Sequence, residues 1–411
     1  MSRSPLLGSV AYATETSFAE ATDAWGTRMS VLGQVDLSGF TQEMLGSDRL
    51  TPYRNQVLPG VKSVRRGAFT TKHYLAGHGS TCAGAITLSD LEVLLGIILG
   101  RGSADVAAAS SSGGTTATAG GTVSSVNVSQ VSGFQAGAIA RAGVLGDARG
   151  NGQPFVVASH GTSIIVPTVN LPTALSAADV VYSPVCVNVP EAPTANAIQS
   201  TRWLLQTGNQ QVKARGVYPK GFTLSASNGS LPTFEAQWGA AWFDLLNQTF
   251  PPAGSMQTHS PAPVAGGSFS LNTVGTATRQ QYVIRDFTLS YSMQVVEQLG
   301  PGGANAYQDV VNCVRVRDEI TVDITIDADN AGTQTLADIW DNNAAVHMLY
   351  GFSAADTTAA GVYLPYCVPI GPRPTQMDLN GINSQRLRFS VGTGATTTNE
   401  RTLSAVRVFL G

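Results

Sequence analysis

The feature that most constrains this chain is a long run near its C-terminus in which apolar and polar residues alternate. The apolar members are Val314, Val316, Ile320, Val322, Ile324 and Ile326. The polar members between them are Arg315, Arg317, Thr321, Asp323, Thr325 and Asp327. Because successive side chains of a strand point to opposite faces, this period of two predicts a long strand that is buried on one face.

A helix signal and a second strand follow this run. Residues 333–340 have the pattern of a short helix, and the alternation resumes through Val346, Met348, Tyr350 and Phe352. A half-buried strand that leads through one helix into another strand predicts a β-sandwich or barrel unit with a single flanking α-helix. The fold class that we expect is therefore mainly β.

A similar order occurs earlier in the chain. A strand is predicted over 68–75, and a largely buried helix follows it, in which Ser89 can cap the N-terminus and Glu92 has capping-box spacing. The tetrapeptide Phe-Thr-Leu-Ser occurs at 222–225 and again at 287–290, both in strand context. The shared strand–helix–strand order is the stronger sign, and it predicts that the unit is duplicated within one chain.

Shifts in composition divide the chain into segments. Residues 1–60 carry little periodicity and are expected to form an N-terminal arm. A first β domain is predicted over 61–250, with a small all-β insertion at about 103–172 that opens with a Ser/Gly/Thr/Ala-rich run. A Pro/Gly/Ser/Thr-rich linker is predicted over 251–278, and a second β domain over 279–411.

Further strands are predicted from shorter alternating runs bounded by turn residues. A turn is expected at Asn228-Gly229, between two of them. The predicted strands are 138–144, 155–158, 163–169, 211–217, 222–226, 234–238 and 287–295.

The composition bears on partners. Charged residues make up 12% of the chain, about half of the roughly 25% that is typical of soluble domains. A surface with so few charges favours coverage by partners or by copies of the same chain, although a Ser/Thr-rich monomeric β-protein has a similar composition. The net charge of −3 gives no basic field that would attract nucleic acid or an anionic membrane.

The sequence lacks the common motifs for catalysis and cofactor binding. It contains no P-loop, no HExxH, no GxSxG and no complete GxGxxG. The segment Gly77-His78-Gly79-Ser80-Thr81 places a His beside a Ser, but a loop between a strand and a helix is the better interpretation. We therefore expect no catalytic residue and no cofactor, and a protein that is not an enzyme.

No metal site is expected either. The four cysteines, Cys82, Cys186, Cys313 and Cys367, form no CxxC pair, and the last two are expected to be buried apolar residues. The segment from Asp327 to Gly332 resembles the start of a calcium loop, but Ala331 takes a ligand position and an Asx-rich turn before a helix explains it equally well. The N-terminus has no apolar core of signal-peptide length, so synthesis in a reducing cytoplasm is expected.

The overall layout resembles a known family. After the arm and the first strand comes a helix of the form Leu-x-x-Leu-Leu-Gly, from Leu91 to Gly96. Gly216-Val217 leads into Phe-Thr-Leu-Ser at 222–225, and Ile284-x-x-Phe follows later, before the second Thr-Leu-Ser. Over about 60–245 and 276–411 this order resembles the major tail tube proteins of long-tailed, non-contractile bacteriophages.

The resemblance implies a structural virion protein. In that family, β-sandwich subunits with one flanking helix form rings whose strands build an inner β-barrel, and the rings stack into a hollow tail tube. The tube encloses the tape-measure protein and conducts DNA to the host. The implied partners are copies of the chain (three per ring with two tube domains, six with one), the tape-measure protein, tail-tip and tail-terminator proteins, and passing DNA without specific binding. No membrane partner is implied.

Two residues are predicted to line the channel of such a tube. Asp323 and Asp327 lie on the polar face of the long predicted strand. A sheet with one wet face suits a lumen, and an acidic or neutral lumen would not hold passing phosphates, whereas a basic one would.

Other classes stay open at this point. A different β-rich virion component, such as a capsid decoration or baseplate protein, would have a similar sequence pattern. A carbohydrate-binding adhesive module is a third hypothesis, because Trp203, Trp238 and Trp242 could stack on sugar rings.

Overall fold

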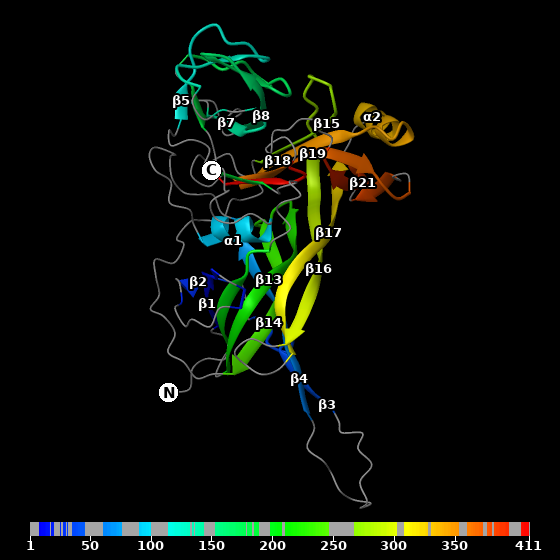
Figure 1. Ribbon diagram of the computed structural model, residues 1–411. Coiled ribbons are helices and arrows are strands. Elements are labelled where there is room, and N and C mark those ends of the chain that lie inside the picture. Colours follow the sequence, from blue (N-terminus) through cyan, green and yellow to red (C-terminus); the bar gives the residue numbers. More distant parts are fainter. Residues whose placement is uncertain are drawn as a thin grey trace, which may run out of the picture.

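The chain folds mainly into antiparallel β-sheets, with two helices among its described residues, as the computed structural model shows (Figure 1). The mainly β fold class predicted from the sequence is thereby confirmed. The structure describes residues 8–16, 18–19, 25, 28–29, 31, 35–45, 61–75, 90–99, 114–131, 134, 136–143, 153–177, 179–182, 185–188, 198–207, 210–245, 267–301, 308–327, 330–352, 360–372, 376–379, 382–393 and 404–410.

A 16-stranded sheet contains most of the strands. Its first half consists of β1 (Gly8–Thr14), β2 (Arg28–Met29), β3 (Thr41–Leu45), β4 (Val61–Tyr74), β12 (Thr201–Thr207), β13 (Gln210–Ser227) and β14 (Thr233–Leu245), together with α1 (Asp90–Ile98). Its second half consists of β15 (Ser268–Thr273), β16 (Val283–Pro301), β17 (Gln308–Asp327), β18 (Val346–Phe352), β19 (Ala360–Pro369), β20 (Gln376–Leu379) and β21 (Ile382–Gly392), together with α2 (Asn330–Asp341). Two short strands, β11 (Val185–Asn188) and β22 (Arg407–Leu410), extend it beside β19.

The two halves have the same strand order. The first half runs β1-β12-β13-β14-β4-β3, and the second runs β15-β18-β19-β21-β17-β16. In each half the helix connects equivalent strands, α1 between β4 and β12 and α2 between β17 and β18. An order shared by six strands and a helix supports the predicted internal duplication.

Details of the two halves match as well. Trp238 on β14 pairs with Phe69 on β4, and Phe389 on β21 pairs with Val322 on β17. Both β3 and β16 carry a register shift, between Gln42 and Met44 in one and between Gln294 and Val295 in the other. A Pro-x-Gly sequence stands at 219–221 in β13 and at 369–371, where it begins with the last residue of β19. These matches fix which positions of the two halves correspond.

The repeated tetrapeptide is not one of these matches. Residues 222–225 lie in β13 and 287–290 lie in β16, which are neighbouring antiparallel strands with Leu224 opposite Leu289. The two copies are therefore paired with each other and do not occupy corresponding places. The evidence for the duplication is therefore the strand order and not this peptide.

Several predicted strand limits need correction. The predicted strands 211–217 and 222–226 are one strand, β13, because a bulge between Pro219 and Gly221 lets the chain continue where the sequence favours a break. Part of the predicted linker 251–278 is strand β15, which buries Phe269 and Leu271 and pairs with β18. The predicted strand 346–352 and the helix over 333–340 are confirmed as β18 and α2.

One hydrophobic core contains residues from both halves. Phe222 of β13 stacks on Tyr291 of β16, where the halves join, with ring centroids 5.2 Å apart. Helix α1 is apolar on most sides, as predicted, and Leu94, Leu95 and Ile98 are fully buried. The joint between β13 and β16 makes the sheet continuous across the middle of the chain.

The predicted insertion forms a second, six-stranded sheet with its own core. Its strands are β5 (Gly114–Thr116), β6 (Val126–Asn127), β7 (Ile139–Gly143), β8 (Gln153–His160), β9 (Ile164–Pro167) and β10 (Val180–Tyr182), so it extends beyond the predicted end at residue 172. In sequence it interrupts the first half, between α1 and β12, but it packs on the second half, with Ile139 and Val156 against Leu349 and Tyr363.

Candidate assembly surface

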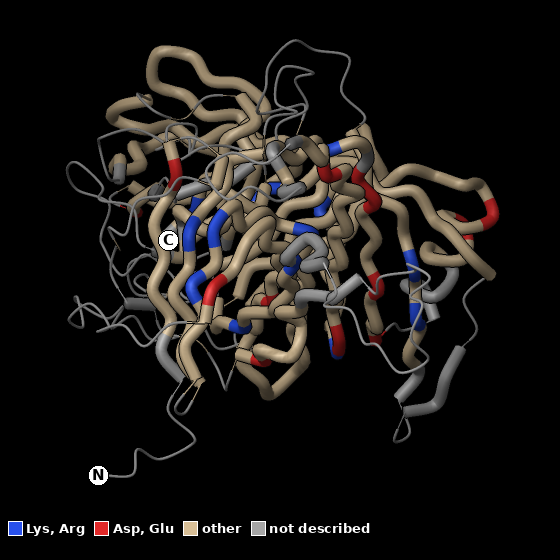
Figure 2. The backbone as a smooth tube through the Cα atoms, turned by 60° about the horizontal axis from the view of Figure 1, so that its bottom comes forward, with Lys and Arg blue, Asp and Glu red and all other residues tan. Residues whose placement is uncertain are grey.

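One face of the large sheet is polar across the joint between its halves. Ser225 of β13 lies opposite Thr288 of β16, which lies opposite Asp323 of β17, which lies opposite Arg388 of β21. The other face of the same strands forms the core. Figure 2 shows basic and acidic positions both spread over the molecule. The sheet therefore has one wet and one dry face, as expected for an antiparallel sheet.

Both residues predicted to line a channel lie on this polar face, and each has an arginine beside it. The Arg388 Nε lies 3.9 Å from an Asp323 carboxylate oxygen. Asp327 accepts hydrogen bonds from the Arg285 Nε at 2.6 Å and from the Ser384 hydroxyl at 2.5 Å. Each carboxylate charge is therefore largely balanced, so this part of the face is closer to neutral than the two residues alone indicate. That they face a lumen stays a prediction.

The distal part of the β16–β17 hairpin extends beyond the shared sheet. Among the residues that the structure describes, β16 pairs only with β17 from Met293 onward, and it packs over the first half through Val295. Glu297 holds it there, because this carboxylate accepts a hydrogen bond from the Tyr218 hydroxyl and lies 3.2 Å from the Arg66 guanidinium. Burial, together with this carboxylate, raises the pKa of Tyr218.

The outer side of this hairpin is apolar and open to solvent. Val316 is 59% exposed and Val296 is 47% exposed. Val296 points away from the first half, because its neighbour Val295 packs against that half. Apolar side chains grouped on an exposed two-stranded hairpin are a feature of protein–protein contacts. The hairpin is therefore one candidate contact surface.

Strand edges supply a second kind of contact surface. Among the described residues, β3 pairs only with β4 and β20 pairs only with β21, so each presents one edge without a partner strand. An unpaired edge has a row of N–H and C=O groups that can pair with another chain.

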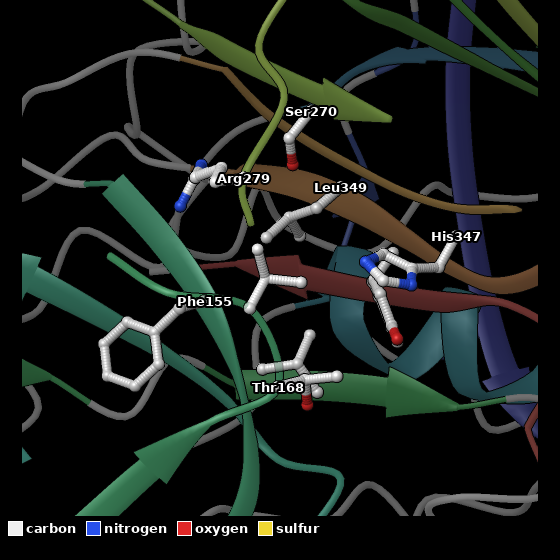
Figure 3. A pocket seen from close by; sticks show the side chains of 9 residues that line it. Phe155, Thr168, Ser270, Arg279, His347 and Leu349 are labelled. Atoms are coloured by element: carbon white, nitrogen blue, oxygen red, sulfur yellow. The ribbon is translucent and has the colours of Figure 1, made fainter. Parts of the chain in front are cut away.

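A small pocket lies where the insertion sheet meets the second half (Figure 3). Its volume is about 20 Å³, room for about one water molecule. The Arg279 Nη1 donates to the Pro154 carbonyl at 3.3 Å, whereas the His347 Nε2 has no partner among the described residues. Burial lowers the pKa of His347 to about 4 and that of Arg279 to about 10. The pocket is too small for an organic substrate.

The buried His347 should make the protein acid-sensitive. Its folded-state pKa of about 4 lies below the ordinary value of 6.5, so the unfolded chain binds the proton more readily. The part of the free energy of unfolding that depends on a neutral His347 is fully present above pH 6.5. It is lost as the pH falls towards 4, by on the order of 3 kcal/mol in total. His347→Gln should flatten this dependence when unfolding is followed in urea between pH 7 and 5. Equal slopes for the two proteins would contradict the assignment.

Two of the three tryptophans proposed for sugar stacking are enclosed in the core. Trp203 and Trp238 are fully buried, with ring centroids 4.9 Å apart. Trp242 is half-buried and lies under the Arg215 guanidinium, 4.9 Å from its ring centroid. The prediction that these tryptophans stack on sugar rings, as in a carbohydrate-binding module, is thus wrong for Trp203 and Trp238.

Among the described residues, no group of three or more His, Cys, Asp or Glu side chains could hold a metal ion. Cys313 and Cys367 are buried, as predicted, and burial raises the pKa of both thiols. Asp329 and the segment 77–81 lie outside the described residues, and α2 begins at Asn330. In the part of the chain that the structure describes, no helix is long and apolar enough to span a membrane.

Comparison with known proteins gives no family for this chain. No protein-family model matches it, and no curated protein matches it.

Proposed function

We propose that this protein is a non-enzymatic structural subunit that assembles with copies of itself into the stacked rings of a phage tail tube. The observation that carries the proposal is the duplicated strand order, in which the two halves are joined by main-chain pairing of β13 with β16. One chain thus already contains a sheet-to-sheet joint of the kind that would link neighbouring subunits of a ring.

A contact of this kind can build a closed ring. A contact between different surfaces of identical chains is head-to-tail, and it closes into a ring when the rotation between copies allows. Unpaired edges such as those of β3 and β20 are a liability in a monomer and an assembly surface in an oligomer. With two repeats per chain, three chains would give a ring with six similar units.

The polar face suits the inside of such a tube. Its Ser and Thr side chains are uncharged, and acidic side chains such as Asp323, Asp327 and Glu235 are interspersed with basic ones such as Arg388, Arg386 and Lys72. A lumen of this kind would not hold DNA by counterion release, so DNA could pass without specific binding. The same lumen would enclose a tape-measure protein during assembly, and the tube ends would contact tail-tip and tail-terminator proteins in the virion.

The proposal is tested by negative-stain electron microscopy of the concentrated protein, with its mass measured by light scattering. Hollow tubes of uniform width, or stackable rings, are expected. If the protein forms no cylinder even when a tail-tip complex is added as initiator, the proposal is wrong. A capsid decoration or baseplate protein would then be the hypothesis to pursue.

The exposed hairpin side chains give a second test of self-assembly. Val296→Lys and Val316→Lys should leave the free energy of unfolding within about 0.5 kcal/mol of the original, because both side chains are solvent-exposed. Both should reduce assembly, since a charge in the centre of a contact is disfavoured. Val274→Lys is the matched control, an exposed valine away from the hairpin. Assembly reduced equally by all three variants would contradict a specific role for the hairpin.

A further inference from the structure

Corresponding positions of the two halves can be compared directly. The pair Trp238–Phe69 in the first half matches Phe389–Val322 in the second. Counting along β14 and β21 from this pair, Ala241 corresponds to Gly392. The Pro-x-Gly sequences likewise align β13 with β19, so Tyr218 corresponds to Val368.

In the first half this place is covered. Tyr218 and Ala241, here called the first patch, are each only 1% exposed. They form a cluster with Val310 and Cys313 of β17, and Val295 of β16 packs against it. Most of the cover is the distal β16–β17 hairpin, which belongs to the other half of the chain, and Phe18 and Ile198 also pack against the cluster.

In the second half the same place is open. Tyr366, Val368 and Gly392, here called the second patch, lie on one face of β19 and β21, with Tyr366 opposite Gly392. The side chains of Tyr366 and Val368 are half-buried and belong to no hydrophobic cluster of the described residues. A Cβ added at Gly392 would meet nothing within 4 Å.

The element that corresponds to the covering hairpin is β3–β4. In the strand order, β4 corresponds to β17 and β3 corresponds to β16. Each hairpin has a register shift, which ends at Met44 in β3 and at Val295 in β16, so Met44 corresponds to Val295. Figure 1 shows β3 and the adjoining end of β4 projecting from the body, at the end remote from β19 and β21. This hairpin therefore does not cover the second patch of its own chain.

We infer that the β3–β4 hairpin of one copy covers the second patch of the next copy, as the β16–β17 hairpin covers the first patch within each chain. The unpaired edge of β20 lies beside this contact, since β20 corresponds to the end of β13 that pairs with β16. The contact is head-to-tail, and it would make every joint around a ring similar. The inference rests on the proposed function and specifies its contact.

Disulfide trapping between separately labelled chains tests this contact. Chains carrying Met44→Cys are mixed with chains carrying Gly392→Cys and oxidised after assembly. A covalent dimer is expected only in the mixture, because a disulfide needs Cβ atoms within about 4.5 Å. Val295→Cys with Ala241→Cys in one chain tests whether the corresponding intrachain positions are close enough to bridge.

The neighbouring residue provides the matched control. Leu45 corresponds to Val296, which lies on the outer side of the hairpin, so Leu45→Cys with Gly392→Cys should give about tenfold less dimer. The unaltered protein controls for its own four cysteines.

A second variant keeps the inference testable if cysteine disturbs folding. Gly392→Arg should fold with an unchanged midpoint of thermal unfolding, because the position is open, and should fail to assemble. The inferred contact is wrong if Gly392→Arg forms tubes normally. It is also wrong if the mixed Met44→Cys and Gly392→Cys chains form tubes but yield no covalent dimer. Either result would leave the proposed function standing. Absence of any cylinder from the unaltered protein would instead reject the proposed function.

Discussion

Trp238→Ala should lower the free energy of unfolding by about 3–5 kcal/mol, because it empties a large aromatic site in the core. The side chain is 1% exposed and packs between Trp203 and Phe69, with ring centroids at 4.9 and 6.4 Å. Its indole N–H donates to the Thr71 hydroxyl at 2.9 Å, so the variant also leaves a buried acceptor without this donor. Urea denaturation followed by circular dichroism measures the loss.

The matched control for this prediction is Trp242→Ala. Trp242 lies four residues further along the same strand, but it is half-buried and stacks under Arg215. Its removal should cost about 1 kcal/mol, the scale of a partly exposed cation–π contact. Equal losses for the two variants would mean that Trp238 is not a core residue.

Gly221→Ala should destabilise the joint between the two halves by about 3 kcal/mol. A Cβ at this position would lie 2.3 Å from the Tyr291 carbonyl oxygen on β16. The obstacle is backbone and cannot rotate away, and the φ of +155° is itself unusual for a residue with a side chain. The variant should therefore separate β13 from β16, and thermal unfolding measures the effect.

Gly392→Ala is the control for that substitution. The position is open and has no positive φ, so the free energy of unfolding should change by less than about 0.5 kcal/mol. If Gly221→Ala is as well tolerated as Gly392→Ala, the close approach of β13 and β16 is not present in solution.

The strands with a clear period of two can be predicted from the sequence, because alternation is local. The prediction for 346–352 agrees with β18 residue for residue, and the long run through Ile326 is the end of β17. Strand β15 has no such signal, since Ser and Asn alternate with only two large apolar residues there. The bulge at Pro219–Gly221 resembles a break in the sequence because the same residues favour turns.

The candidate surface is predictable only in part. The alternating pattern places Asp323 and Asp327 on the polar face, but their partners Arg388 and Arg285 are on other strands, and only the register brings them together. The Pro-x-Gly sequences at 219–221 and 369–371 are a sign of duplication that can be found in the sequence, although our prediction of duplication did not use them. The unpaired edge of β20 is a property of the fold and has no local signal.

The most direct test of ring assembly is a cryo-electron microscopy reconstruction of the protein assembled at high concentration or from a tail-tip complex. We expect a hollow tube whose rings each contain three chains and six similar sheet units, with Asp323 and Asp327 towards the channel. A filled filament, or a particle in which the two halves of one chain do not occupy similar places around a central axis, would contradict this expectation.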